Sequence, residues 1–167
     1  TGLPNSQAVV NNPADALASP YGWHDIDGQP GHEFSDTRGN NVAAQEDRND
    51  DNADGFRPTG KQPKKFNFDY PFDPTRNPIE GNNPAVAIIN LFYWNNILHD
   101  IAYRYGFDEV SGNFQENSYG RGGLGADAIQ ADAQDAYDFG VRNNAYFMTA
   151  PDGVPPRLGT FVFDLTT

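Results

Sequence analysis

The chain has 167 residues, a formal net charge of −12 and no cysteine. This length suits one domain with a sizeable core, and the strong negative charge disfavours nucleic acid and anionic membranes as partners. The lack of cysteine excludes disulfide scaffolds, thiolate metal sites and a cysteine nucleophile, and no apolar run reaches the roughly 18 residues of a membrane span.

The aromatic content of 13% argues against disorder, while 17 glycines and 13 prolines favour a loop-rich fold with short elements. We expect an α+β fold with mostly short antiparallel strands and loops around one long central helix. Residues 1–81 are interpreted as a region of loops and strands, in which strands are predicted near 41–44 and at 66–70, where alternation ends at Pro71.

Residues 84–105 are predicted to form the central helix. Asn83 is expected as the N-cap, Pro84 occupies the first helical position, and Gly106 favours a left-handed C-terminal cap. Further apolar residues lie on other faces, so we expect neighbouring elements to cover the helix. An apolar stripe is formed by Leu91, Trp94, Leu98, Ile101 and Tyr105.

Residues 108–167 are predicted to contain loops and a hairpin. A short helix is expected at 126–136, followed by strands at 144–149 and 157–164 with a turn between them. The chain stops at Thr167 without an evident closing element, which we interpret as a cut.

Three histidines are present, and none has a recognised zinc-ligand spacing. We therefore do not expect a zinc site from His24, His32 and nearby carboxylates. His99 precedes Asp100 in the predicted helix and shares a face with Asn95 and Tyr103. It either orients a catalytic neighbour or is a buried histidine satisfied by hydrogen bonds.

Asp50, Asn52 and Asp54 have the opening spacing of an EF-hand-type calcium loop and precede Gly55. The twelfth position is Lys61 where such a loop has a bidentate Glu, and no helices flank it. We therefore expect a weak calcium site or a simple acidic turn.

Residues 143–147 read Asn-Asn-Ala-Tyr-Phe and begin the first strand of the predicted hairpin. At the edge of a sheet, such a segment presents an amide side chain and unpaired backbone groups. An extended peptide binds such an edge by strand addition, although an ordinary strand start has the same pattern.

Several segments together resemble the N-terminal half of the catalytic domain of the fungalysin family, secreted zinc metalloendopeptidases with a thermolysin-like fold. The segments are SPYGWHD (19–25), TRGNNV (37–42), NLFYWNNILHDIAYRYGFDEVSGNFQENSYGRGG (90–123), ADAQD (131–135) and NNAYF with the following PDG (143–153).

The resemblance implies that Asn144, Ala145 and Tyr146 belong to the substrate-binding edge strand, with Asn144 bonding through its amide and Ala145 through its main chain. It also implies zinc held by two histidines of a His-Glu-x-x-His helix and a distal glutamate, and the helix glutamate acts as general base. The chain lacks that motif. We therefore expect no catalytic or zinc-binding residue here, and a C-terminal zinc-binding half as partner.

By this resemblance the chain is the substrate-binding part of a secreted, extracellular peptidase that acts on proteins or peptides, and it is inactive alone. The alternative is a secreted, non-catalytic acidic module that binds calcium or peptides. A His-Glu-x-x-His motif encoded after Thr167 would favour the peptidase.

Overall fold

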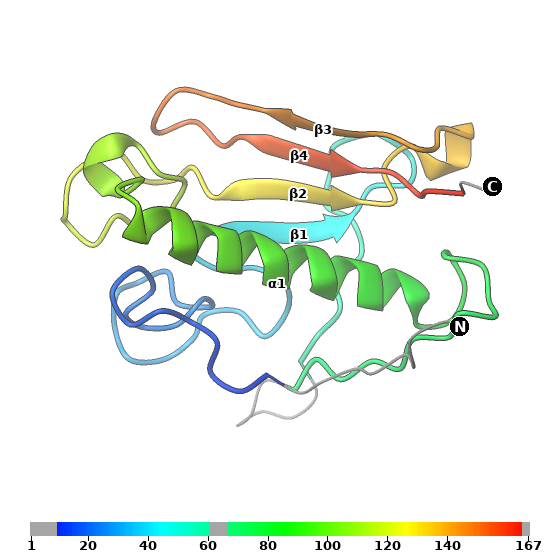
Figure 1. The fold of residues 1–167 in the computed structure, drawn as a ribbon, viewed down its shortest axis with the longest axis horizontal. Coiled ribbons are helices and arrows are strands. Elements are labelled where there is room, and N and C mark those ends of the chain that lie inside the picture. Colours follow the sequence, from blue (N-terminus) through cyan, green and yellow to red (C-terminus); the bar gives the residue numbers. More distant parts are fainter. Residues whose placement is uncertain (1–9, 61–66, 165–167) are drawn as a thin grey trace.

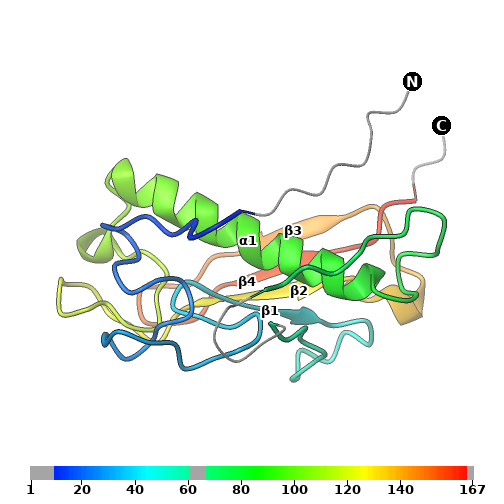
Figure 2. The same ribbon diagram turned by 90° about the horizontal axis from the view of Figure 1, so that it is seen from below.

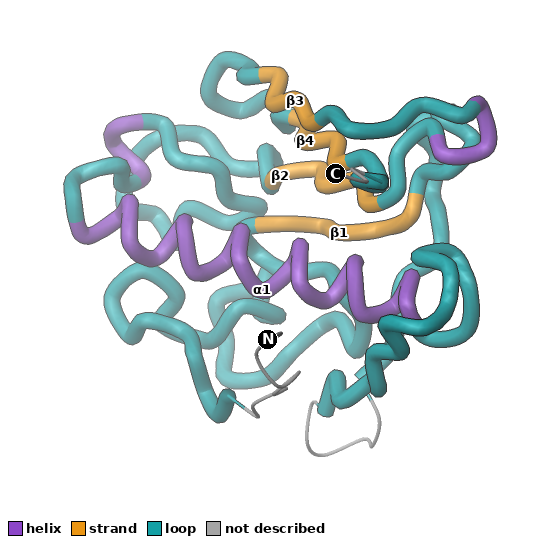
Figure 3. The backbone as a smooth tube through the Cα atoms, turned by 45° about the vertical axis from the view of Figure 1, so that its right-hand side comes forward, coloured by secondary structure: helices purple, strands orange, loops and turns teal. Residues whose placement is uncertain are grey.

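One long helix and a four-stranded sheet organise the part of the chain that the computed structural model describes, residues 10–60 and 67–164 (Figure 1). The mixed α+β class is therefore confirmed. Loops make up most of the backbone, as Figure 3 shows. Two single-turn 3₁₀ helices, Glu109–Ser111 and Tyr137–Phe139, lie within the long connections.

Helix α1 runs from Asn83 to Arg104, one residue earlier than predicted at each end. Its N-cap is Asn82 and not Asn83, and the Asn82 side chain makes no capping hydrogen bond. Asn83 is buried instead, and its side-chain oxygen accepts a hydrogen bond from the backbone N–H of Asp73 at 3.0 Å. Gly106 has a φ of 95° just beyond the helix, as expected for a residue that ends it.

The sheet contains β1 (Val42–Glu46), β2 (Ile129–Ala133), β3 (Ala145–Met148) and β4 (Arg157–Thr160) in the order β1-β2-β4-β3. β1 with β2 and β2 with β4 pair in parallel, whereas β3 and β4 pair in antiparallel as a hairpin. The strand near 41–44 and the hairpin are confirmed. The expectation of mostly antiparallel strands is wrong, because the long connections through α1 and through the hairpin return the chain in the same direction.

Two local predictions are also wrong. Residues 67–70 form no strand, and Phe66 lies outside the described residues. The alanine-rich segment 126–136 contains β2 in place of a helix, with Ala126, Gln134 and Ala136 in the left-handed region at φ values of 64°, 58° and 52°. Burial between β1 and β4 thus overrides the helical propensity of alanine in this segment.

The hydrophobic core lies between α1 and the strands β1 and β2. Figure 2 shows the helix lying along one face of the sheet. Ile88 and Phe92 of the helix meet small residues of the strands, among them Ala44 and Ala131. Small side chains let the helix approach the sheet closely. The buried core consists of Trp23, Val42, Ala44, Ile88, Phe92, Ile129, Ala131 and Ala133.

Leu91 of the predicted apolar stripe packs against this core, whereas the other four residues of the stripe face away from it. The exposed fractions are 53% for Trp94, 59% for Leu98, 50% for Ile101 and 89% for Tyr105. The helix instead turns polar Asn96, His99 and Asp100 inward together with its buried apolar residues. The sheet covers one face of the helix and the segment around Trp23 packs on another, so the expectation that neighbouring elements cover the helix is correct for those faces and wrong for the described outer face.

The position of β2 predicts that Ala131→Leu lowers stability. Ala131 has no exposed surface and packs in the core, so a larger side chain should cost about 1–3 kcal/mol of unfolding free energy. Denaturant unfolding would measure the change. On a surface helix the same substitution would be nearly neutral, so an unchanged unfolding midpoint would contradict the buried strand.

Candidate substrate-binding edge

Strand β3 is the outer strand of the sheet and pairs only with β4 among the described residues. The Phe161 N–H donates to the Asn144 carbonyl at 3.1 Å, and Tyr146 is the register partner of Gly159. Backbone groups in an antiparallel strand alternate in direction. The backbone N–H and C=O of Ala145 and Phe147 therefore point away from β4 to the open edge.

The two adjacent asparagines at the start of β3 have different environments. Asn143 has a φ of 58°, and its side chain bonds to Asp164 twice, donating at 2.6 Å and accepting from the backbone N–H at 2.9 Å. The exposed Asn144 instead accepts the neighbouring Ala145 N–H through its side-chain oxygen at 2.9 Å. Asn143 thus fixes the strand entry, while Asn144 keeps its amide N–H groups at the surface.

Tyr146 holds the edge strand against the sheet. Its ring lies over Gly159, where an added Cβ would come within 2.2 Å of the ring and 2.3 Å of an oxygen of Asp135. Burial, together with the Asp135 carboxylate, raises the pKa of Tyr146, so this hydroxyl stays protonated at neutral pH. Of the three residues predicted at the edge, Tyr146 is thus the one whose side chain packs inward.

A buried ion pair lies in the neighbouring strands. Arg157 of β4 pairs with Asp132 of β2, whose side chain is fully buried and also accepts a hydrogen bond from Gln45 at 3.0 Å. The Thr160 hydroxyl donates to the Asp132 carbonyl at 3.0 Å. These contacts tie β4, and through it β3, to the centre of the sheet.

The expected calcium residues Asp50, Asn52 and Asp54 are all exposed and have different contacts. Asp54 pairs with Arg57 at 3.1 Å, and the Asn52 backbone N–H donates to the buried Asp47 carboxylate at 3.1 Å. Asp50 lies close to Asp47 and Asp135, two carboxylates that the sequence analysis did not single out. Their signal was their place within two residues of the ends of two strands.

The His99–Asp100 pair of α1 is buried in a hydrogen-bond network. Asp100 accepts hydrogen bonds from the Ser19 hydroxyl at 2.7 Å and from the Trp23 indole at 2.8 Å, and its Oδ1 lies 3.1 Å from His99 Nδ1. Burial raises the pKa of Asp100, but these hydrogen bonds outweigh it and lower the value overall. The network accounts for His99 structurally, as a histidine satisfied by hydrogen bonds.

The described residues do not fit a zinc centre. His24 stacks on Phe92 with ring centroids 4.9 Å apart, and its burial lowers the pKa of His24 from 6.5 to about 4. The groups of side chains close enough to share a metal contain only carboxylates within the described residues: Asp25, Asp27 and Glu33 form one, and Asp47, Asp50 and Asp135 the other. Protein zinc sites are built largely from histidine nitrogen and cysteine sulfur.

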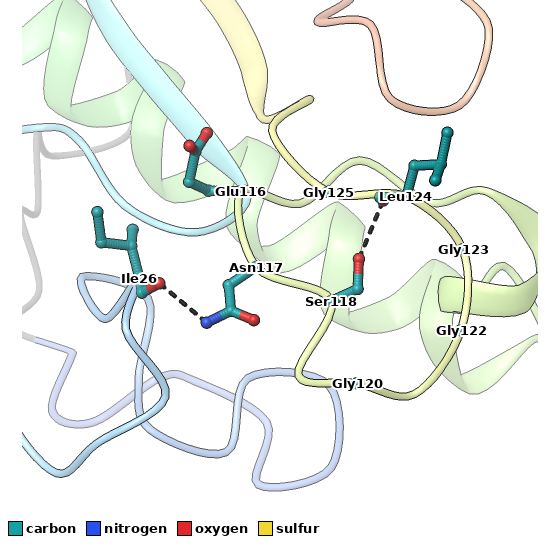
Figure 4. A pocket seen from close by; sticks show the side chains of 9 residues that line it. All are labelled: Ile26, Glu116, Asn117, Ser118, Gly120, Gly122, Gly123, Leu124 and Gly125. Carbon is teal, nitrogen blue, oxygen red and sulfur yellow. Dashed lines mark hydrogen bonds between the residues drawn. The ribbon is translucent and has the colours of Figure 1, made fainter.

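An open hollow lies beside the glycine-rich loop that follows α1 (Figure 4). Its polar side chains serve the loop itself: Asn117 donates to the Ile26 carbonyl at 2.9 Å and Ser118 to the Leu124 carbonyl at 2.9 Å. The lining residues are Ile26, Glu116, Asn117, Ser118, Gly120, Gly122, Gly123, Leu124 and Gly125.

Within the described residues, no helix has the length and apolar character needed to cross a membrane.

Comparison with known proteins identifies the family. The model of the fungalysin metallopeptidase (M36) family matches residues 3–167. The chain belongs to this family. The resemblance inferred from the sequence motifs is thereby confirmed.

Fungal secreted proteases are among the relatives. The chain is 40% identical over 157 residues to a probable extracellular metalloproteinase 1 of Trichophyton verrucosum (strain HKI 0517), covering 93% of the chain and 23% of that protein. It is 38% identical over 160 residues to an extracellular metalloproteinase 5 of Arthroderma gypseum (strain ATCC MYA-4604 / CBS 118893), covering 95% and 23%. The chain thus spans about a quarter of the length of these relatives.

Proposed function

We propose that residues 1–167 form the N-terminal, substrate-binding subdomain of a thermolysin-like, secreted zinc metalloendopeptidase. The single observation that carries this proposal is the open edge of β3, where Ala145 turns its backbone groups outward beside the exposed Asn144. Family membership supplies the reaction class, because a metallopeptidase needs a surface that holds a peptide in an extended form.

The edge would bind its substrate by strand addition. An extended peptide pairs with the N–H and C=O of Ala145, and the Asn144 amide adds a hydrogen bond to the peptide backbone. In the free chain the Asn144 oxygen accepts the Ala145 N–H, so binding requires that local contact to open. Aligning the scissile bond in this way lowers the entropic cost of reaching the transition state.

Zinc would be held by a different part of the enzyme. The described side chains offer no cluster with a nitrogen ligand, and the full sequence contains no His-Glu-x-x-His. A zinc ion bound there polarises the substrate carbonyl and activates water. This chain contributes substrate alignment to that reaction.

The exposed face of α1 supports the zinc-binding half as the partner. Trp94, Leu98, Ile101 and Tyr105 present large apolar side chains along one side of the helix. An apolar patch of this kind marks an interaction surface, and the relatives are about four times as long as the chain. We infer that the zinc-binding half covers this face.

The acidic clusters suit the alternative, a secreted non-catalytic module that binds calcium or peptides. A peptidase assay distinguishes the peptidase subdomain from the non-catalytic module. The isolated chain 1–167 should show no peptidase activity with zinc, because it lacks the metal ligands and the general base. Zinc-dependent cleavage of casein by the purified chain would contradict the division of roles between two halves.

Asn144→Ala should weaken catalysis in the assembled enzyme. Loss of one or two substrate hydrogen bonds predicts a fall in kcat/KM equivalent to roughly 1–3 kcal/mol. Peptide hydrolysis kinetics would measure it. Asn82→Ala is the matched control, because Asn82 is also exposed and its side chain makes no capping bond. Equal kcat/KM for Asn144→Ala and the parent enzyme would remove Asn144 from the substrate site.

Leu98→Asp should disrupt assembly with the zinc-binding half while leaving the fold of this chain intact. Leu98 is 59% exposed, so a charge is tolerated in the free chain but becomes costly once a partner buries it. Co-expression of the two halves and co-purification would show at least about a tenfold loss of complex. Leu98→Met keeps the apolar character and should assemble normally. Full assembly of Leu98→Asp would show that this face is not the interface.

A further inference from the structure

The carboxyl ends of β1 and β2 bring three carboxylates together. Asp47 directly follows β1, Asp135 lies two residues beyond β2, and Asp50 comes from the turn after Asp47. Because β1 and β2 are parallel, both chain segments leave the sheet at the same end. One oxygen from each of the three carboxylates lies within 4.8 Å of those of the other two.

Asp135 distinguishes this cluster from an ordinary acidic surface. Its exposed fraction is 1%, and neither of its carboxylate oxygens has a hydrogen-bond partner. The Tyr146 hydroxyl lies close enough to affect the pKa of Asp135, but it completes no hydrogen bond to either oxygen. A buried carboxylate left without any partner is costly, so its orientation toward two further carboxylates points to a missing cation.

No side-chain cation neutralises the cluster within the described part of the chain. The nearby Arg157 is already paired with Asp132, and Arg48 pairs with Glu46 and Asp138. The uncompensated negative charge therefore remains at the carboxylates themselves.

We propose that Asp47, Asp50 and Asp135 bind a calcium ion. All the available ligand atoms are oxygens on irregular backbone, a donor set that suits the flexible coordination of calcium better than the strict octahedron of magnesium. Asp47 is held in place for this role, because its two oxygens accept the backbone N–H groups of Asp51 and Asn52 at 3.1 Å each. Asp50 has a φ of 50°, which turns the chain back toward Asp47.

The ion would stabilise the segment that leads into β3. The Asp135 N–H donates to the Thr160 carbonyl at 3.1 Å, and the Ala136 N–H donates to the Asp47 carbonyl at 3.1 Å. A cation shared by Asp47 and Asp135 therefore connects the end of β1 to the start of the loop before the edge strand. The ligand set overlaps the sequence expectation only at Asp50.

The test uses the full-length protein that carries these residues, with zinc present throughout. Terbium, a calcium analogue, should bind with luminescence sensitised by nearby tyrosine such as Tyr146, and calcium should displace it. Calcium added in the absence of terbium should raise the Tm by about 5 °C or more, because it binds the folded state. Absence of both responses would overturn the site.

Variants assign the ligands. Asp135→Asn should weaken terbium binding at least tenfold and remove most of the calcium-dependent rise in Tm. Since a change at a buried position can also impair folding, Asp50→Asn provides a second test at an exposed ligand and should weaken terbium binding severalfold. Asp54→Asn is the matched control: it removes the same charge from the same loop but should leave binding unchanged.

Two results would contradict the assignment. If Asp54→Asn weakens binding as much as Asp50→Asn, the ion belongs to Asp50, Asn52 and Asp54 instead. If Asp27→Asn alone removes the response, the ion lies at the cluster of Asp25, Asp27 and Glu33. Both readouts report metal binding and stability, so either result leaves the proposed peptidase function untouched.

Discussion

The parallel pairing of β2 with both β1 and β4 is the constraint on which the rest of the structure depends. It places an alanine-rich strand at the centre of the sheet, where small side chains admit α1 closely. It also leaves β4 with one free side, which the hairpin fills with β3, so that β3 becomes the edge. The same pairing aligns the ends of β1 and β2, and this alignment gathers the carboxylates of Asp47 and Asp135. One pairing therefore sets both the open strand and the acidic cluster.

Buried hydrogen bonds, in addition to the apolar core, fix the N-terminal segment against α1. Asp100 joins the segment around Ser19 and Trp23 to α1 through buried hydrogen bonds. Such contacts specify position well, because an unpaired buried donor or acceptor costs more than a hydrogen bond contributes. These contacts accompany an arrangement in which α1 turns Asn96, His99 and Asp100 inward and leaves Trp94, Leu98, Ile101 and Tyr105 exposed. The loops of the N-terminal region are thereby fixed without regular secondary structure.

The sequence correctly predicted the elements that neighbouring residues determine, such as helix ends and a hairpin turn. Pro84 and Gly106 located α1 to within a residue, and alternation with a turn located the β3–β4 hairpin. Non-local causes were not predictable in this way. The alanine-rich segment before Ala136 has helical propensity, and only its burial between two parallel partners makes it a strand. Periodicity showed that α1 has an apolar stripe but not which face meets the sheet. Asp135 likewise becomes a candidate metal ligand only because it lies close to Asp47, which is far away in the sequence.

The two open features of the structure differ in what can fill them. The edge of β3 offers backbone hydrogen bonds with little regard to side chains, which suits an extended peptide of varied sequence. The outer face of α1 offers apolar area around Leu98 and few hydrogen-bonding groups, which suits a permanent partner that excludes water. A substrate must leave after each turnover, whereas a subdomain need not. The proposed division of roles is consistent with both surfaces. A substrate that must dissociate would bind the backbone groups of β3, and the zinc-binding half, which stays bound, would cover the apolar face of α1.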